Sequence, residues 1–144
     1  MITTMISIEY FTVGHPRIIE SESPIHLALL WGFIATWWVG LILGILISIV
    51  SRVGNYPKLG IREVIPLMLK LILAMMIGAF ISGWIGFFLT KQNFIYLADY
   101  LAQHIDKERH HLFLTAGWAH GASYLVGCIG GLVISFKIWR KRKN

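Results

Sequence analysis

Residues 24–51 read PIHLALLWGFIATWWVGLILGILISIVS, an apolar run long enough to cross a membrane as a helix. Small residues recur within it at every fourth position, and the same spacing occurs in two later apolar runs. The three ladders are Ala28, Gly32, Thr36, Gly40, Gly44 and Ser48; Ala74, Gly78, Ser82, Gly86 and Thr90; and Ala119, Ser123, Gly127, Gly131 and Ser135. Residues four apart share one face of a helix, so each ladder predicts a face that another helix can approach closely. The positions that we expect at helix contacts are Gly32, Gly40, Gly44, Gly78, Ser82, Gly86, Ser123, Gly127 and Gly131.

The composition is typical of an integral membrane protein. Of the 144 residues, 56% are hydrophobic, and the mean hydropathy is +0.68. The formal charge of +6 does not indicate a nucleic-acid-binding protein, because the positive residues lie at the ends of the apolar runs. The single cysteine, Cys128, forms no internal disulfide, and we expect it to be a small apolar side chain.

The apolar runs predict an all-α membrane protein with a single domain and three transmembrane helices, over residues 24–51, 64–90 and 112–139. Each helix would be roughly 40 Å long against a hydrocarbon core of about 30 Å, so we expect tilt or protruding ends. The rest of the chain divides into an N-terminal tail, a loop, a segment between the second and third helices, and a basic tail. These are residues 1–23, 52–63, 91–111 and 140–144, respectively.

The segment between the second and third helices has a pattern of its own. Its apolar residues recur at helical spacing, as Phe94, Leu97, Leu101 and Ile105. Polar and charged residues occupy the other positions of the helical wheel. The pattern predicts an amphipathic helix over 91–111 that lies on the membrane surface or caps the bundle.

The N-terminal tail lacks the features of a signal peptide, because it has no basic start and no apolar stretch of sufficient length. Ile6, Ile8 and Tyr10 alternate with other residues, which predicts a short extended piece. The sequence Gly14-His15-Pro16 should then interrupt any regular structure.

The distribution of lysine and arginine predicts the orientation in the membrane. Nine of these residues fall on one side, namely Arg52, Lys58, Arg62, Lys70, Lys137, Arg140, Lys141, Arg142 and Lys143. Four fall on the other, namely Arg17, Lys91, Lys107 and Arg109. We therefore expect a cytoplasmic C-terminus and an external N-terminus, an arrangement that fits a multi-pass protein of a bacterial inner membrane.

All six histidines lie on the expected outer side or in the outer half of a helix. His120 lies deepest, about eight residues into the third predicted helix, where a polar side chain is costly and often functional. One hypothesis is that His120 ligates haem or a transition metal, with His26 from the first helix as the second ligand. The simpler interpretation is a neutral histidine that hydrogen-bonds to a neighbouring helix and binds no cofactor.

A second group of candidate metal ligands follows the second helix. If one helix ran through residues 104–111, His104, Glu108 and His111 would share one face, and the last two would match the Glu-x-x-His spacing of carboxylate-bridged metal sites. Against a metal site, the apolar runs contain no further carboxylate, and residues 106–109 form a mixed charge run typical of a solvated turn.

The sequence contains no phosphate-binding glycine loop, no Gly-x-Ser-x-Gly elbow, no His-Glu-x-x-His and no Cys-x-x-Cys. The leading prediction is therefore a non-enzymatic membrane protein, either an accessory or structural subunit of a membrane complex or a homo-oligomer. Its partners would be the bilayer and other membrane subunits or copies of itself. One alternative is a haem- or metal-binding electron-transfer subunit that uses His120 and His26, and another is an oligomeric channel.

Overall fold

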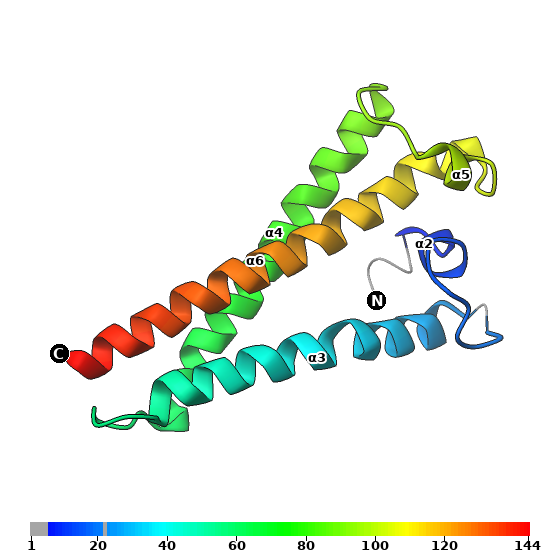
Figure 1. Ribbon diagram of the computed structural model, residues 1–144. Helices are drawn as coiled ribbons and strands as arrows, with labels where there is room; N and C mark the ends of the chain where they lie inside the picture. Colours follow the sequence, from blue (N-terminus) through cyan, green and yellow to red (C-terminus); the bar gives the residue numbers. More distant parts are fainter. Residues whose placement is uncertain (1–5, 22) are drawn as a thin grey trace.

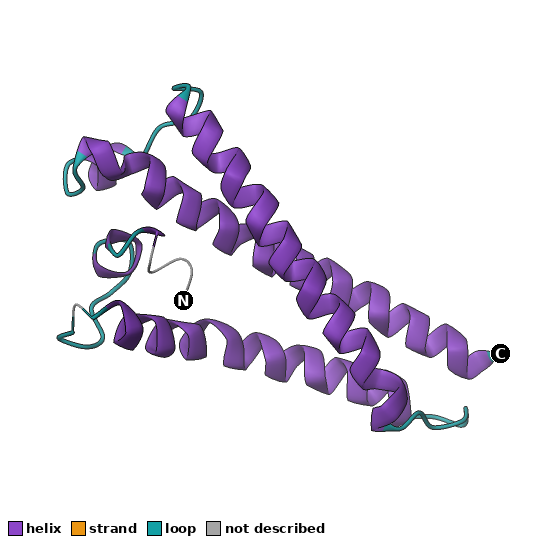
Figure 2. Cartoon of the chain, turned by 180° about the vertical axis from the view of Figure 1, so that it is seen from behind, coloured by secondary structure: helices purple, strands orange, loops and turns teal. Residues whose placement is uncertain are grey.

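The computed structural model describes residues 6–21 and 23–144, and residues 1–5 and 22 of the expected N-terminal tail lie outside the described part (Figure 1). The described residues are mostly helical, with loops between the helices and no strand (Figure 2). The long helices are α3 (Pro24–Arg52), α4 (Ile61–Lys91) and α6 (His110–Lys143). Shorter elements are α2 (Glu9–Thr12), α5 (Asp99–Ala102) and the 3-10 helix η1 (Lys107–Arg109).

The prediction of three long apolar helices is confirmed. Each is long and apolar enough to cross a membrane. The helices begin and end within a few residues of the expected positions, and α6 continues through most of the basic segment 140–144.

The helices α3 and α6 run in the same direction, and α4 runs in the opposite one (Figure 1). One end of the molecule, which we call the α2 end, holds α2 and residues 92–109. The opposite end, which we call the loop end, holds residues 53–60 and the C-terminus. The three long helices meet at the loop end, where Ile47 of α3, Leu71 of α4 and Ile138 of α6 form a buried cluster with Ile134.

Arg142 fastens α3 to α6 at the loop end. Its side chain is buried, and its guanidinium group donates hydrogen bonds to the carbonyl oxygens of Val50 and Val53 at 2.5 and 3.0 Å. It also donates to the carbonyls of Tyr56 and Pro57 at 3.0 and 2.7 Å. A cation at the C-terminus of α3 satisfies carbonyls that have no partner within the helix and interacts favourably with the helix dipole.

The helices α4 and α6 lie in close contact at several small residues. A Cβ built on Gly86 would lie 2.7 Å from Cγ of Trp118, and one built on Gly78 would lie 2.9 Å from Cγ2 of Val126. Between these positions, the Ser82 hydroxyl donates a hydrogen bond of 3.1 Å to the carbonyl of Trp118. The ladder of α4 therefore faces α6.

The ladder of α3 has a different environment. A Cβ built on Gly32, Gly40 or Gly44 would meet no atom within 4 Å outside its own helix. The residues of α3 that contact α6 include Ala35, Leu43 and Ile47, which lie one position before members of the ladder. One position corresponds to a rotation of about 100° around the helix axis, so these glycines lie to one side of the contact between α3 and α6.

The prediction of a short extended piece in the N-terminal segment is wrong. Residues Glu9–Thr12 form the helix α2, and the side chain of Phe11 within this helix is buried. The segment buries its apolar side chains against α3 and α6, and this tertiary packing overrides the weak alternating pattern.

The prediction of one amphipathic helix over 91–111 is also wrong. Between the end of α4 at Lys91 and the start of α6 at His110, the chain forms only the short helices α5 and η1. The chain leaves α4 through Asn93, which has a positive φ of 58°. The amide of Phe94 then donates to the carbonyl of Leu89, and the amide of Asn93 donates to that of Thr90. These bonds form the standard left-handed stop of a helix, which asparagine tolerates.

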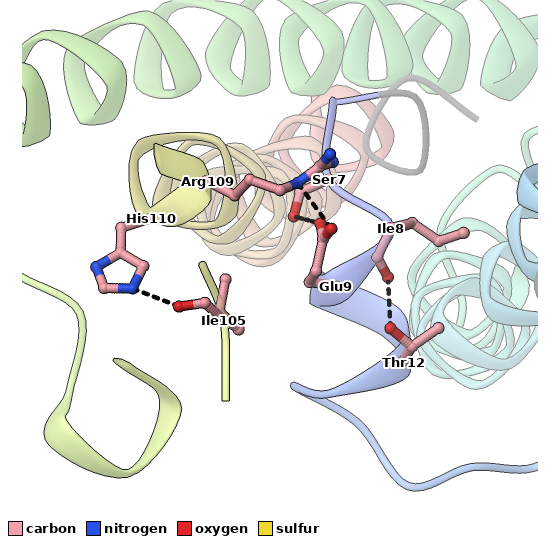
Figure 3. A network of polar contacts seen from close by, with 7 residues as sticks. All are labelled: Ser7, Ile8, Glu9, Thr12, Ile105, Arg109 and His110. Carbon is pink, nitrogen blue, oxygen red and sulfur yellow. Dashed lines mark hydrogen bonds and ion pairs between the residues drawn. The ribbon is translucent and has the colours of Figure 1, made fainter. Parts of the chain in front are cut away.

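Three of the four apolar residues of the predicted pattern, Leu97, Leu101 and Ile105, nevertheless pack into one cluster, whereas Phe94 is exposed. Leu97 and Ile105 pack with Phe113 of α6, and Tyr10 of α2 lies against the same cluster. An ion pair of 2.7 Å between Glu9 and Arg109 holds α2 to the start of α6 (Figure 3). The α2 end is thus closed by the N-terminal segment and residues 94–109 together.

Candidate functional site

A cavity of about 350 Å³ lies between α2, α3 and α6, in the part of the molecule nearer to the α2 end. The residues that line it are mostly aromatic, with two histidines. They are Phe11, His15, Trp31, Ile34, Ala35, Trp38, His120 and Tyr124. Its volume is within the range of small-molecule sites, which combine apolar walls with a few polar groups.

Helical spacing explains how α3 and α6 supply two walls. Trp31, Ala35 and Trp38 lie on one face of α3, because residues four and seven apart are neighbours along a helix. His120 and Tyr124 are four apart on α6, and their rings meet edge to face with centroids 4.8 Å apart. The Tyr124 hydroxyl donates a hydrogen bond of 2.9 Å to the carbonyl of Ala35 and so ties the two walls together.

The N-terminal segment supplies the third wall. The ring of Tyr10 lies 5.0 Å from that of His15 and 5.8 Å from that of His120, measured between centroids. Gly14 permits this packing, because a Cβ there would lie 2.6 Å from the Tyr10 carbonyl oxygen and 2.9 Å from Cζ of Phe113. His15 therefore reaches the cavity from a segment that packs tightly on α6.

The hydrogen bond of His15 fixes its tautomer. Nδ1 of His15 lies 2.7 Å from the carbonyl oxygen of Tyr10, and a carbonyl oxygen can only accept. Nδ1 must therefore carry the proton, which leaves Nε2 of the neutral ring as an acceptor. The ring is further held at 4.7 Å from Trp31 and 5.7 Å from Phe11.

No lysine, arginine, aspartate or glutamate is among the described residues that line the cavity. Tyr10, next to both histidines, stays neutral at physiological pH. Burial, together with the nearby Tyr124 hydroxyl, raises the pKa of the Tyr10 phenol above its usual value. A ligand that fits these walls is itself uncharged, since a charge would lose its hydration without gaining a counter-charge.

The structure places the two histidines of the sequence hypothesis in different environments. His120 lines the cavity, whereas His26 is exposed and its Nδ1 lies 3.0 Å from the hydroxyl of Ser21. His15 is the histidine that shares the cavity with His120. Sequence reasoning missed His15 because nothing local indicates that the segment after α2 folds back onto α6.

The group His104, Glu108 and His111 does not lie on one helix. The helix α5 ends at Ala102, Glu108 belongs to η1, and His111 is in the first turn of α6. Nδ1 of His104 contacts the carbonyl of Tyr100 at 2.7 Å, and the ring of His111 packs on Phe87. Among the described residues, no group of three or more His, Cys, Asp or Glu side chains is arranged to hold a metal ion.

No protein family, curated protein or solved structure matches the chain.

Proposed function

We propose that the protein is a non-enzymatic membrane subunit that associates with another transmembrane helix through the glycine face of α3. The partner helix belongs either to a second copy or to another subunit of a membrane complex. The observation that carries the proposal is the open space around Gly32, Gly40 and Gly44, where an added Cβ would meet nothing within 4 Å.

The contact between α4 and α6 supports this interpretation. In that pair, small residues bring the helices close enough for backbone and side chains to touch, as at Gly78 and Gly86. Small residues at every fourth position are the usual means by which helices associate in lipid, where apolar side chains alone give little preference for another helix over lipid. The same spacing in α3 provides a second face of this kind, and its glycines Gly32, Gly40 and Gly44 meet no other element in the described part of the chain.

We further propose an orientation with the loop end in the cytoplasm and the α2 end outside, as in a bacterial inner membrane. The charges that support it are the nine lysine and arginine residues associated with the loop-end halves of the helices, against four at the α2 end. The exposed basic residues near the C-terminus would also attract anionic headgroups, with about 1 kcal/mol for each one near the surface. They are Lys137, Arg140, Lys141 and Lys143.

A channel is less well supported than a subunit role. The hydroxyls of Thr36, Ser82 and Ser123 each donate to a backbone carbonyl, at 2.6, 3.1 and 3.1 Å, respectively. These hydroxyls are therefore engaged by the helices, and they come from three different helices without lining one shared cavity.

The experiment is native mass spectrometry on protein extracted gently from its own membranes. We expect the wild type to carry a second copy or another chain, and Gly40→Leu to be released as a monomer. Gly121→Leu is the matched control, because Gly121 of α6 also has nothing within 4 Å but lies outside the α3 face. Monomeric wild-type protein, or equal loss of the partner in both variants, would contradict the proposal.

A further inference from the structure

We propose that the cavity between α2, α3 and α6 binds the ring of a lipid-soluble quinol, with a ring hydroxyl donating to Nε2 of His15. The proposal rests on insertion of the protein in a membrane, but not on the association of α3 with a partner.

The walls of the cavity are mainly apolar and aromatic. Phe11, Trp31 and Trp38 give flat apolar surfaces, and no charged residue lines the cavity within the described part of the chain. Aromatic walls favour a planar ring, because rings stack in offset or edge-to-face arrangements. A strongly ionic ligand would find no lysine, arginine, aspartate or glutamate there. Among the described residues, no group of three or more His, Cys, Asp or Glu side chains could hold a metal ion.

The cavity lies at a depth in the membrane that an apolar ligand can reach. Trp31 and Trp38 lie seven and fourteen residues after Pro24, which places them roughly 10 and 21 Å along α3. In a hydrocarbon core of about 30 Å, these positions are below the headgroups. Trp38 is 46% exposed, so the cavity wall reaches the surface that lipid would cover. A ligand would therefore enter from the lipid phase, as an apolar molecule with an isoprenoid tail can.

The hydrogen bond that His15 makes within the protein determines which ligand atoms it can bind. The proton on Nδ1 of His15 is held by the Tyr10 carbonyl at 2.7 Å, so Nε2 can accept a hydrogen bond but cannot donate one in the neutral ring. A quinol hydroxyl donates, whereas a quinone carbonyl only accepts. The His120 ring packs against Tyr10 and Tyr124. It can form a hydrogen bond with the second oxygen of the ligand, as donor or acceptor according to its tautomer. The site therefore distinguishes the reduced ligand from the oxidised one.

The test is equilibrium binding of decylubiquinol and decylubiquinone to the full chain in lipid nanodiscs, with empty nanodiscs as the blank. We expect one saturable site for each chain and an affinity for the quinol about 10-fold higher than for the quinone, the value of one hydrogen bond of about 1.4 kcal/mol. His15→Ala and His120→Ala should each weaken quinol binding about 10-fold or more. His26→Ala and His104→Ala remove histidines that do not line the cavity, so these variants should bind the quinol as tightly as the wild type.

A cavity-filling variant keeps the test decisive if a histidine variant fails to fold. Ala35→Phe retains both histidines and should abolish binding by occupying the space. The proposal is overturned by the absence of saturable binding, by tighter binding of the quinone, or by equal losses in His26→Ala and His15→Ala. Stoichiometric haem or copper that is lost in His120→Ala would also overturn it. Extraction of the protein from membranes by alkaline carbonate would instead show that insertion itself had failed.

Discussion

The pair α4 and α6 and the helix α3 carry the same spacing of small residues but use it differently. In the pair, Gly78 and Gly86 face side chains of α6 at distances that leave no room for a Cβ. In α3, Gly32, Gly40 and Gly44 face open space, whereas Ala28 near one end of the helix and Ile47 near the other are buried. Small residues at every fourth position therefore show where another helix can approach closely. Whether a helix of the same chain occupies that face depends on the large residues around it.

The largest expected effect concerns the fastening of α3. Arg142→Ala leaves the four carbonyls that its guanidinium satisfies without this partner, and we expect a loss of about 3 kcal/mol in the free energy of unfolding. Arg140→Ala, an exposed arginine two residues earlier, is the control and should be near neutral. Unfolding titrations with sodium dodecyl sulfate in mixed micelles measure both. Equal losses in the two variants would show that the Arg142 contacts do not hold α3.

The next effect tests the two kinds of glycine directly. Gly86→Ala adds a methyl group where Trp118 leaves no space, whereas Gly40→Ala adds one where nothing lies within 4 Å. Alanine is the better helix former at both positions, so the variants share that gain and differ in crowding. We expect Gly86→Ala to be less stable than Gly40→Ala by about 2 kcal/mol in the same micelles. Equal stability would remove the distinction between the two helix faces.

A smaller effect is expected at the α2 end. Glu9→Gln weakens the ion pair with Arg109, which is 42% exposed, so we expect a loss of only about 0.5 kcal/mol. The measurement is hydrogen exchange of the amides in α2, which should become faster while those of α4 stay unchanged. Glu20→Gln, at an exposed position outside this contact, is the control. Unchanged exchange in α2 would mean that apolar packing alone holds the segment.

The smallest effect is a pH dependence. Because the pKa of Tyr10 is raised in the folded protein, its neutral form stabilises the fold below pH 10, and this contribution is lost as the pH rises from 10 through the raised pKa. Thermal unfolding between pH 9 and 11 should therefore show a steeper loss of stability in the wild type than in Tyr10→Phe. The same slope in both proteins would contradict a burial effect on this residue.

The long helices could be predicted from the sequence because lipid leaves a backbone few alternatives to a continuous helix over an apolar run. Their ends were predicted within a few residues, although α4 begins at Ile61 and α6 continues to Lys143. The break after α4 was missed, because the periodicity of Leu97, Leu101 and Ile105 reports a buried face and not the conformation that buries it.

The candidate site could be predicted only in part. The depth of His120 in its helix indicated a polar position of interest, and the structure places it in the cavity wall. The partner histidine could not be predicted, because His15 reaches the cavity through contacts of Tyr10 and Gly14 with α6, more than 90 residues away. Arg142 was hidden in the same way, since a basic tail gives no local sign that one of its side chains is buried.

Crosslinking in native membranes tests whether α3 presents an open face to another helix. A benzophenone maleimide is attached to a cysteine at position 33 or 45, in a background in which Cys128 is replaced by serine and every glycine of α3 is kept. Phe33 is exposed and lies seven residues before Gly40, on the same side of the helix, whereas Ile45 is exposed on a different side and provides the matched reference. We predict a crosslinked second chain from position 33 and a much weaker product from position 45. Equal products, or a product from position 45 alone, would contradict an open face on the glycine side of α3.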